Sequence, residues 1–193
     1  METEVKIIGL LFVVCGVLLF GAGCRDKYEP PEIPLDLLAA SDLLEVARHG
    51  DAQAQLMMGR RYFHGAGVET NVAEAVKWYE KAAAQDLGEA KYELAMCLFR
   101  GIKVRFGEDE AVDYLRFAAE EEVPPAQEML GSLYFHGKIV ERDEAVATNY
   151  WTRAAENGDR LARRNLAEWQ LEQLRIHGRS AQSPTDHEES AAR

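Results

Sequence analysis

The chain has little cysteine: it contains three among 193 residues. Cys15 lies within an uncharged apolar run near the N-terminus, and Cys24 comes directly after that run. Only Cys97 remains in the rest of the chain, so no second thiol is available there to form an intramolecular disulfide. A disulfide-stapled scaffold is therefore excluded, and we expect Cys97 to be a small buried apolar residue rather than a reactive thiol.

Basic residues are also scarce. The chain has 22 Lys and Arg against 33 Asp and Glu, which gives a formal net charge of −11. Binding to a nucleic-acid backbone needs clustered Lys and Arg side chains, so this balance argues against a nucleic-acid partner. The acidic excess favours solubility and basic partners, and it carries no information about the fold.

Short motifs of common catalytic and metal sites are missing as well. The sequence has no HExxH pair, no paired CxxC, no Asp-rich calcium loop, no nucleophile elbow and no Gly-rich phosphate loop after a strand. The acidic run Glu120-Glu121-Glu122 is typical of a solvated helix end rather than of a catalytic carboxylate pair. We therefore expect no enzyme activity, no cofactor and no bound metal.

An apolar segment stands at the N-terminus. Residues 7–23 carry no charge, and the small residues 21–23 lead directly to Cys24. The segment resembles a bacterial lipoprotein signal, in which the Cys after the small residues is lipidated, for example with palmitate, and becomes the new N-terminus. Two features depart from that pattern. Gly21 stands where a Leu-like residue is usual, and the charge of Lys6 is offset by nearby Glu residues.

Three interpretations of this segment stay open: a lipoprotein signal, an uncleaved membrane anchor and a cleaved secretory signal. All three place the rest of the chain outside the cytoplasm. We expect a membrane-anchored lipoprotein of the bacterial cell envelope, facing the periplasm or the exterior, with Cys24 as the lipidation site.

The sequence between residues 51 and 162 repeats with a period of 36 residues. Five sets of positions keep this step without an insertion: Ala54, Ala90, Ala126 and Ala162; Gly65, Gly101 and Gly137; Val68, Val104 and Val140; Trp78, Tyr114 and Tyr150; and Ala82-Ala83, Ala118-Ala119 and Ala154-Ala155. A fixed period of this size is typical of a solenoid built from stacked structural repeats.

Each repeat predicts two helices. In the first repeat, Ala54, Met58 and Tyr62 recur at helical spacing and end at Gly65, which suits a left-handed C-cap. Asn71 is a plausible N-cap for the second helix, which places the aromatic and Ala residues of VAEAVKWYEKAAAQ on one face. No strand-like alternation of useful length occurs between residues 35 and 177, so the sequence predicts an all-α fold.

These residues resemble Sel1-like repeats, which are related to tetratricopeptide repeats. The first repeat matches the family pattern at Ala54, Met58, Gly59, Tyr62, Gly65, Gly67, Val68, Ala75, Trp78, Tyr79, Ala82 and Ala83. The third matches at Ala126, Leu130, Gly131, Tyr134, Gly137, Val140, Asp143, Ala147, Tyr150, Ala154, Ala155 and Gly158. The middle repeat is weaker, with Ala95 in place of the Gly and Leu98 in place of the Tyr. The period of 36 also differs from the 34 of tetratricopeptide repeats.

The resemblance implies an α/α right-handed superhelical solenoid. We expect a signal or membrane segment at 1–23, a linker at 24–34, a repeat domain at 35–177 and a disordered tail at 178–193. The repeats fall at about 51–86, 87–122 and 123–158. Residues 35–49 align with a second helix and those after Ala162 with a first helix. We expect both to cap the stack, with Trp169 covering its C-terminal end.

His64 and His136 lie in two copies of the sequence YFHG, 72 residues or two repeats apart. Because stacked helices are about 10 Å apart, the two side chains are too distant to share a metal, whose bonds to His are about 2 Å. Arg100 holds the position between them. One interpretation is that all three are cations at helix C-termini, where the helix dipole favours them. The other is that they form a column that a partner contacts.

By the resemblance, first helices line the concave face of such a stack. Residues neighbouring the column, Arg60, Met96 and Tyr92, complete our candidate partner-binding set. The aromatic pairs at 78–79 and 150–151 are expected to pack between helices rather than to form a ligand cage.

The resemblance implies a non-enzymatic scaffold or adaptor that binds a protein or peptide on the concave face, tethered to the cell envelope. Two alternatives remain. Cysteine-rich relatives are associated with β-lactam binding or hydrolysis, but they carry a Cys pair in each repeat, which this chain lacks. The chain could also be a purely structural spacer.

Overall fold

The structure, a computed structural model, describes residues 33–180. This part forms one short 3-10 helix and eight α-helices and contains no β-strand, which confirms the predicted all-α class. The elements are η1 Leu35–Leu37, α2 Ala40–Arg48, α3 Ala52–His64, α4 Val72–Ala83, α5 Gly88–Phe99, α6 Glu108–Glu120, α7 Pro124–His136, α8 Glu144–Glu156 and α9 Arg160–Ser180.

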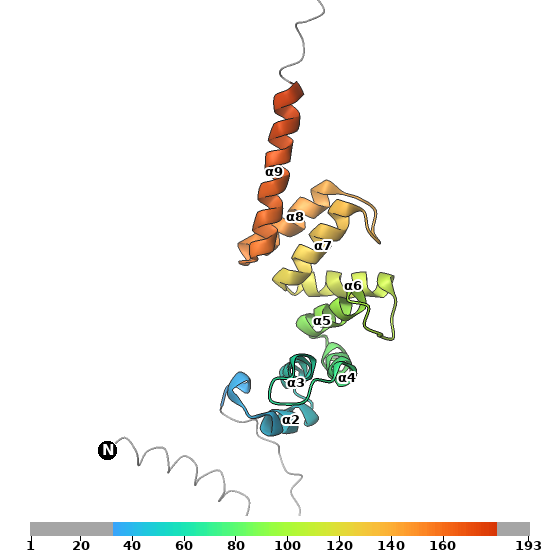
Figure 1. Ribbon diagram of the computed structural model, residues 1–193, viewed down its shortest axis with the longest axis vertical. Coiled ribbons are helices and arrows are strands. Elements are labelled where there is room, and N and C mark those ends of the chain that lie inside the picture. The colour runs from blue at the N-terminus through green and yellow to red at the C-terminus, as the bar shows by residue number, and fades with distance from the viewer. Residues whose placement is uncertain (1–32, 181–193) are drawn as a thin grey trace, which may run out of the picture. The chain divides into compact units, whose positions relative to one another are not determined.

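The helices stack in chain order, and each packs mainly against the helices before and after it (Figure 1). The closest pairs are α3 with α4, α5 with α6 and α7 with α8, which are the two helices of each predicted repeat. The fold is therefore an α/α solenoid. Helices α3, α5, α7 and α9 are the first helices of successive repeats, and α2, α4, α6 and α8 are the second helices.

Side chains and glycines define the helix ends where the sequence predicts them. The Asn71 side chain accepts a hydrogen bond from the Glu74 backbone N–H at 3.0 Å, and Asp143 caps α8 in the same way at 2.9 Å. Gly65 follows α3 in the left-handed conformation, at φ 75°, which a residue without a Cβ adopts at little cost. These caps confirm the predicted ends of the helices.

The second helices end at residues that share a positive φ and the 36-residue step: Gly50, Asp86, Glu122 and Gly158. Asp86 and Glu122 adopt φ values of 60° and 57° although they have side chains. Glu122 accepts hydrogen bonds from Arg153 at 2.6 Å and from Gln127 and Asn157 at 2.8 Å, and these bonds lower its pKa to about 2. Its carboxylate thus links the end of α6 to α7 and α8.

Within a repeat, a small residue on the first helix faces a large one on the second. A Cβ at Gly59 would lie 2.5 Å from the Tyr79 ring, and one at Gly131 would lie 2.4 Å from the Trp151 ring. In the middle repeat, the equivalent pair is Ala95 and Leu115, and both are fully buried in one cluster. Ala95 is larger than the Gly of the other repeats, and Leu115 is smaller than their aromatic residue. The two changes compensate in volume, so the middle repeat is packed as well although it matches the family pattern less closely.

The N-terminal end of the stack is covered by helix α2. Helix α2 occupies the place of a second helix and buries Leu43 and Val46 against Trp78 of the first repeat. Trp78 is itself buried, which confirms its packing role, and its indole N–H has no hydrogen-bond partner in the part of the chain that is described.

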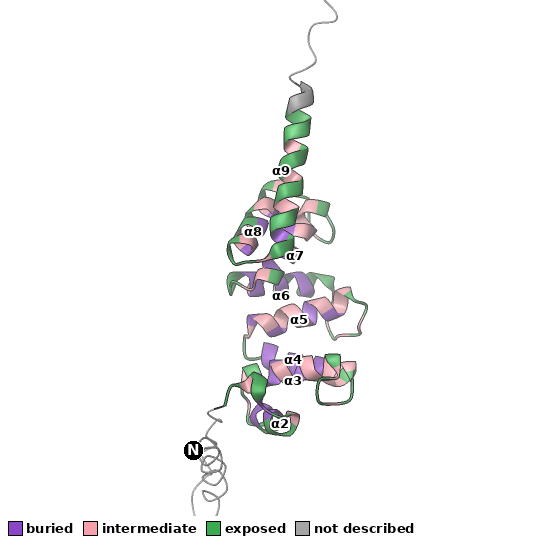
Figure 2. Ribbon diagram, turned by 60° about the vertical axis from the view of Figure 1, so that its left-hand side comes forward, coloured by how far each residue is buried: buried purple, intermediate pink, exposed green. Residues whose placement is uncertain are grey.

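The C-terminal end is covered only in part. Ala162 of α9 is buried against Trp151 and Ala154 of α8, and the half-buried Trp169 packs on the same cluster. Beyond this point α9 extends away from α8, and its C-terminal half is mostly exposed (Figures 1 and 2). Helix α9 therefore covers α8, and its own outer side is exposed.

Helix α9 continues to Ser180, past residue 177, where we expected the repeat domain to end and a tail to begin. The composition changes at Gly178, but a single Gly costs a helix only about 1 kcal/mol and does not end it. The predicted segment 1–23, Cys24 and residues 181–193 lie outside the described residues. Among the helices that the structure does describe, none combines the length and apolarity needed to cross a membrane.

Candidate functional site

Every fourth residue of the first helices lies on one side of the stack, which we call the first-helix face. It is formed by Leu56, Arg60 and His64 of α3; Tyr92, Met96 and Arg100 at α5; Glu128, Ser132 and His136 of α7; and Arg164, Glu168 and Glu172 of α9. All six candidate partner-binding residues belong to this face.

Between α3 and α5 this face is occupied by ion pairs. The Arg60 side chain donates from Nε to Glu93 Oε1 at 2.9 Å and from a terminal nitrogen to Glu89 Oε2 at 3.1 Å. Both carboxylates belong to α5, so Arg60 bridges neighbouring first helices. Its guanidinium is engaged within the stack rather than free for a partner.

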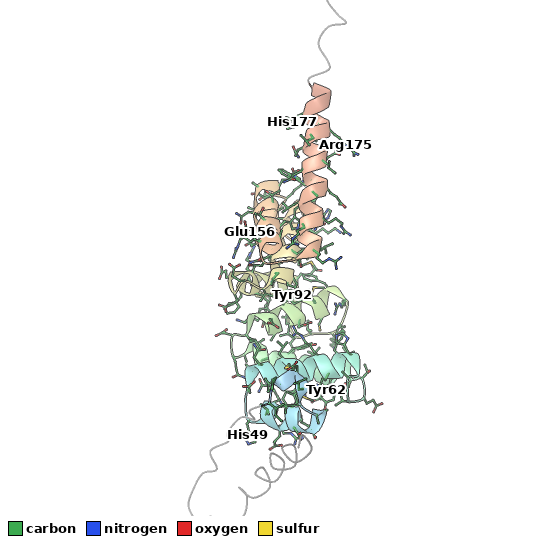
Figure 3. All side chains as sticks on the ribbon, turned by 90° about the vertical axis from the view of Figure 1, so that its left-hand side faces the viewer. His49, Tyr62, Tyr92, Glu156, Arg175 and His177 are labelled. Carbon is green, nitrogen blue, oxygen red and sulfur yellow. The ribbon has the colours of Figure 1, made fainter. Side chains whose placement is uncertain are left out.

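At α5 the face is mixed in character. Tyr92 and Met96 are half-buried, and Tyr92 packs against the core of the middle repeat (Figure 3). Burial, with a further contribution from Glu93, raises the pKa of the Tyr92 phenol. Arg100 is exposed and lies over the ring of Phe63, 5.4 Å from its centroid. Cys97 is buried on the other side of α5, and burial raises the pKa of its thiol to about 11.

His64 and His136 are exposed and are the last residues of α3 and α7. Each rests edge-on against the preceding Phe ring, with centroids 5.1 Å apart at Phe63 and 5.2 Å apart at Phe135. They belong to different repeats and do not meet. Within residues 33–180, no three His, Cys, Asp or Glu side chains form a group that could hold a metal ion.

Between α7 and α9 the first-helix face opens into a groove of about 520 Å³. Its polar lining includes Glu128, Ser132 and His136 of α7 and Arg164, Glu168 and Glu172 of α9. Its apolar lining includes Phe135, Trp151, Leu161 and Trp169. One of the candidate residues, His136, thus lies in a groove, at its α7 side.

Glu128 lies at the base of this groove and is only 8% exposed. Its Oε1 accepts hydrogen bonds from Ser132 Oγ and from Asn165 Nδ2 of α9, both at 2.8 Å. The Trp151 indole N–H of α8 donates to the Glu128 backbone carbonyl at 3.2 Å. Burial raises the pKa of the Glu128 carboxyl, and the bond from Ser132 opposes part of that rise. One residue therefore ties together the three helices around the groove.

The rim on the α8 side is fixed by a second carboxylate. Glu144 at the start of α8 accepts from the Trp169 indole N–H at 3.2 Å and pairs with Arg142. These bonds, first that from Trp169 and then that from Arg142, lower the pKa of Glu144. Trp169 is therefore held by a polar contact as well as by packing, which sets the position of α9 against α8.

The repeat pattern decides the family. The Sel1 repeat family matches residues 52–87, 88–122 and 124–159, which together make up more than half of the chain. The chain belongs to the Sel1 repeat family. Proteins built from Sel1 repeats are generally non-catalytic scaffolds for protein–protein interaction.

Two solved structures share this fold. A Sel1 repeat protein from Oxalobacter formigenes is 34% identical, with a TM-score of 0.60 over 67% of this chain and 97% of its own. The immunity protein Pa5087 from Pseudomonas aeruginosa is 22% identical, with a TM-score of 0.50 over 75% of this chain and 61% of its own. The second similarity shows the fold alone. No curated protein matches the chain.

Sequence reasoning did not single out the groove. It assigned no role to Glu128 or Arg164. The sequence did contain an indication of the groove. At the position where the first two repeats have Leu56 and Tyr92, the third repeat has the carboxylate of Glu128. A buried carboxylate in an apolar column needs partners, and Ser132 and Asn165 supply them.

Proposed function

We propose that this Sel1 repeat protein is a non-enzymatic scaffold, tethered to the bacterial cell envelope through its N-terminal segment, that binds a protein or peptide partner. The groove between α7 and α9 is its principal binding site. The single observation that carries this proposal is the groove of about 520 Å³ on the face made by the first helices. In related repeat stacks this is the concave face.

The lining of the groove suits a peptide with a large apolar anchor. Phe135, Trp151 and Trp169 provide aromatic surface in the interior, and Arg164 and Glu172 provide charge at the edge. Apolar centres with polar rims are typical of protein interfaces, and aromatic anchors contribute most of their binding energy. Because the groove is formed by packed helices, little ordering is needed on the scaffold side.

His136 extends the groove toward the end of α7, where His64 and Arg100 mark the equivalent ends of α3 and α5. A long partner would follow these three exposed side chains along the first-helix face. We therefore keep His64, Arg100, Met96 and Tyr92 as secondary contacts and assign the main anchor to the α7–α9 groove.

Photocrosslinking in the native envelope tests the proposal. The full chain carries a photoreactive amino acid at Glu172, which lines the groove, or, as a control, at Lys77, which is exposed on the second helix α4. We expect a discrete crosslinked protein from the Glu172 position and none from the Lys77 position. Equal products from both positions would contradict a groove-specific partner.

A groove-closing variant makes the test specific. This variant copies the side chains of the α3–α5 interface into the equivalent positions of the α7–α9 interface. It carries the substitutions Glu128→Leu, Ser132→Arg, Leu161→Glu and Asn165→Glu. We expect crosslinking from Glu172 to fall at least about tenfold while helix content is retained, because about 1.4 kcal/mol of lost anchoring corresponds to that factor. Undiminished crosslinking would show that the partner does not use the groove.

The matched control is His64→Ala with Arg100→Ala, which changes the column at α3 and α5 and leaves the lining of the groove intact. Crosslinking should fall in this variant if the partner also contacts the column, and it should be unchanged if the partner is confined to the groove.

The tether is tested separately by labelling with radioactive palmitate. We expect label in the native chain and none in Cys24→Ala, and label in neither would contradict the lipid anchor.

A further inference from the structure

Helix α9 is a first helix that has no second helix after it in the described chain. In the third repeat, Gly131 and Phe135 face α8, and the Phe135 ring lies 5.1 Å from that of Trp151. The equivalent residues of α9, one repeat later, are Ala167 and Leu171. They keep the small and apolar character of that side, but no second helix covers them within residues 33–180.

The outer side of α9 is apolar and exposed. Leu171 and Leu174 are 58% and 69% exposed, and they lie one turn apart. Ala162 and Trp169, which pack on α8, point to the opposite side of the helix, since they are separated from the leucines by about half a turn. Adjacent exposed leucines on a helix that extends from the stack mark an interaction surface.

We propose that two copies of this chain dimerise through the outer side of α9, with the two helices antiparallel. In this arrangement Leu171 of each copy packs on Leu174 of the other, so the contact is symmetric and self-complementary. Residues 167, 171 and 174 follow the four-three spacing of a coiled-coil seam. The helices overlap over about residues 165–180.

The charges beside the seam favour a second copy as the occupant. Glu168 and Arg175 lie seven residues apart on the same flank of the seam. When two such helices pack antiparallel, each flank of one chain lies against the same flank of the other chain. Glu168 of one chain therefore meets Arg175 of the other, twice per dimer. The opposite flank pairs the two polar residues Gln170 and His177.

Both charged residues are available for such pairing. Within α9, Glu168 pairs with Arg164 at 3.6 Å, and Arg175 pairs with Glu172 at 3.6 Å. These pairs are exposed and contribute little, so they exchange at small cost. Arg175 and His177 project from the C-terminal part of α9, beyond the other helices (Figure 3). Because each copy's stack lies on the side of α9 away from the seam, the two stacks do not collide.

Sedimentation velocity of the full chain in mild detergent, across a concentration series, tests the dimer. We expect reversible dimerisation of the native chain. Leu171→Ala with Leu174→Ala should raise the dissociation constant at least about tenfold, because each leucine is buried twice per dimer. The matched control is Leu37→Ala, which removes a leucine 71% exposed on η1 and should leave the constant unchanged.

Charge exchange tests the orientation. Glu168→Arg alone and Arg175→Glu alone should each weaken the dimer, because each places like charges opposite one another. The double exchange should restore it. A native chain that stays monomeric, or a dimer that is indifferent to the leucine pair, overturns the proposal. If the double exchange does not restore the dimer affinity that the single exchanges lower, the antiparallel pairing is wrong. The purified chain is free of partner, so these outcomes are independent of the proposed groove.

Discussion

The first-helix face is closed between α3 and α5 and open between α7 and α9, although the two interfaces are the same part of the repeat. At the first interface Arg60 reaches across to Glu89 and Glu93. The equivalent residues at the second are Ser132, Leu161 and Asn165, two repeats later.

A Ser side chain is too short to cross the gap, and Ser132 turns back to Glu128 of its own helix. The space that a long ion pair fills at one end of the stack is therefore a groove at the other. The difference shows how one repeat geometry, with a few side chains exchanged, produces either a sealed contact or a binding site.

The largest effect is expected from removing the aromatic wall of the open interface. Trp151→Ala should lower the free energy of unfolding by about 3–5 kcal/mol, as other large-to-small core changes do. Trp78→Ala removes a buried indole at the closed end and should cost a similar amount. Chemical denaturation measures both. A negligible loss for either variant would mean that its indole is not a packing residue.

A smaller effect is expected from Gly131→Ala. The added Cβ would lie 2.4 Å from the Trp151 ring and 3.0 Å from the Ala147 carbonyl oxygen. Overpacking costs about 1–3 kcal/mol, and the better helix propensity of Ala returns about 1 kcal/mol, so we expect a net loss of at most about 2 kcal/mol. In a Trp151→Leu background, which copies Ala95 and Leu115 of the middle repeat, Gly131→Ala should cost less. An equal cost in both backgrounds would show that the two positions do not interact.

Glu128→Gln tests the buried carboxylate that distinguishes the open interface. Because burial raises its pKa in the folded chain, the folded state binds the proton more tightly than the unfolded state. The native chain therefore loses stability as the pH rises from the ordinary Glu value of 4.5 through the raised pKa. Gln accepts the same two hydrogen bonds without a charge. Denaturation at several pH values should show that the free energy of unfolding of the variant rises relative to that of the native chain across this pH window. A difference that stays constant with pH would contradict the raised pKa.

The smallest effect is expected at the closed interface. Arg60→Ala removes two ion pairs that are partly exposed, so the free energy of unfolding should fall by about 1 kcal/mol or less. The loss should shrink in high salt, which screens these charges. Arg48→Ala is a suitable control, because Arg48 forms an exposed pair with Glu45 at 3.7 Å. A loss as large as that of Trp151→Ala would mean that Arg60 holds the helices together rather than filling the surface between them.

Much of the fold follows from the sequence alone. The fixed period establishes the register, and Gly65, Asn71 and Trp78 take the roles that the pattern assigns to them. The groove does not follow, because the pattern tells which residues share a face but not whether a side chain reaches the next helix. Comparing Arg60 with Ser132 would have indicated a difference in reach. The Asn165 bond to Glu128 depends on where α9 lies, and the Trp169 bond to Glu144 fixes that position.

The linear stacking of the helices has a consequence for the order in which the chain comes apart. Since each helix is held mainly by its neighbours, opening can start at either end without disturbing the middle. Helix α9 is the last element of the described chain, and its detachment would remove one wall of the groove. A ligand bound between α7 and α9 therefore stabilises α9 against local unfolding. Its binding would be measured as slower amide hydrogen exchange in α9.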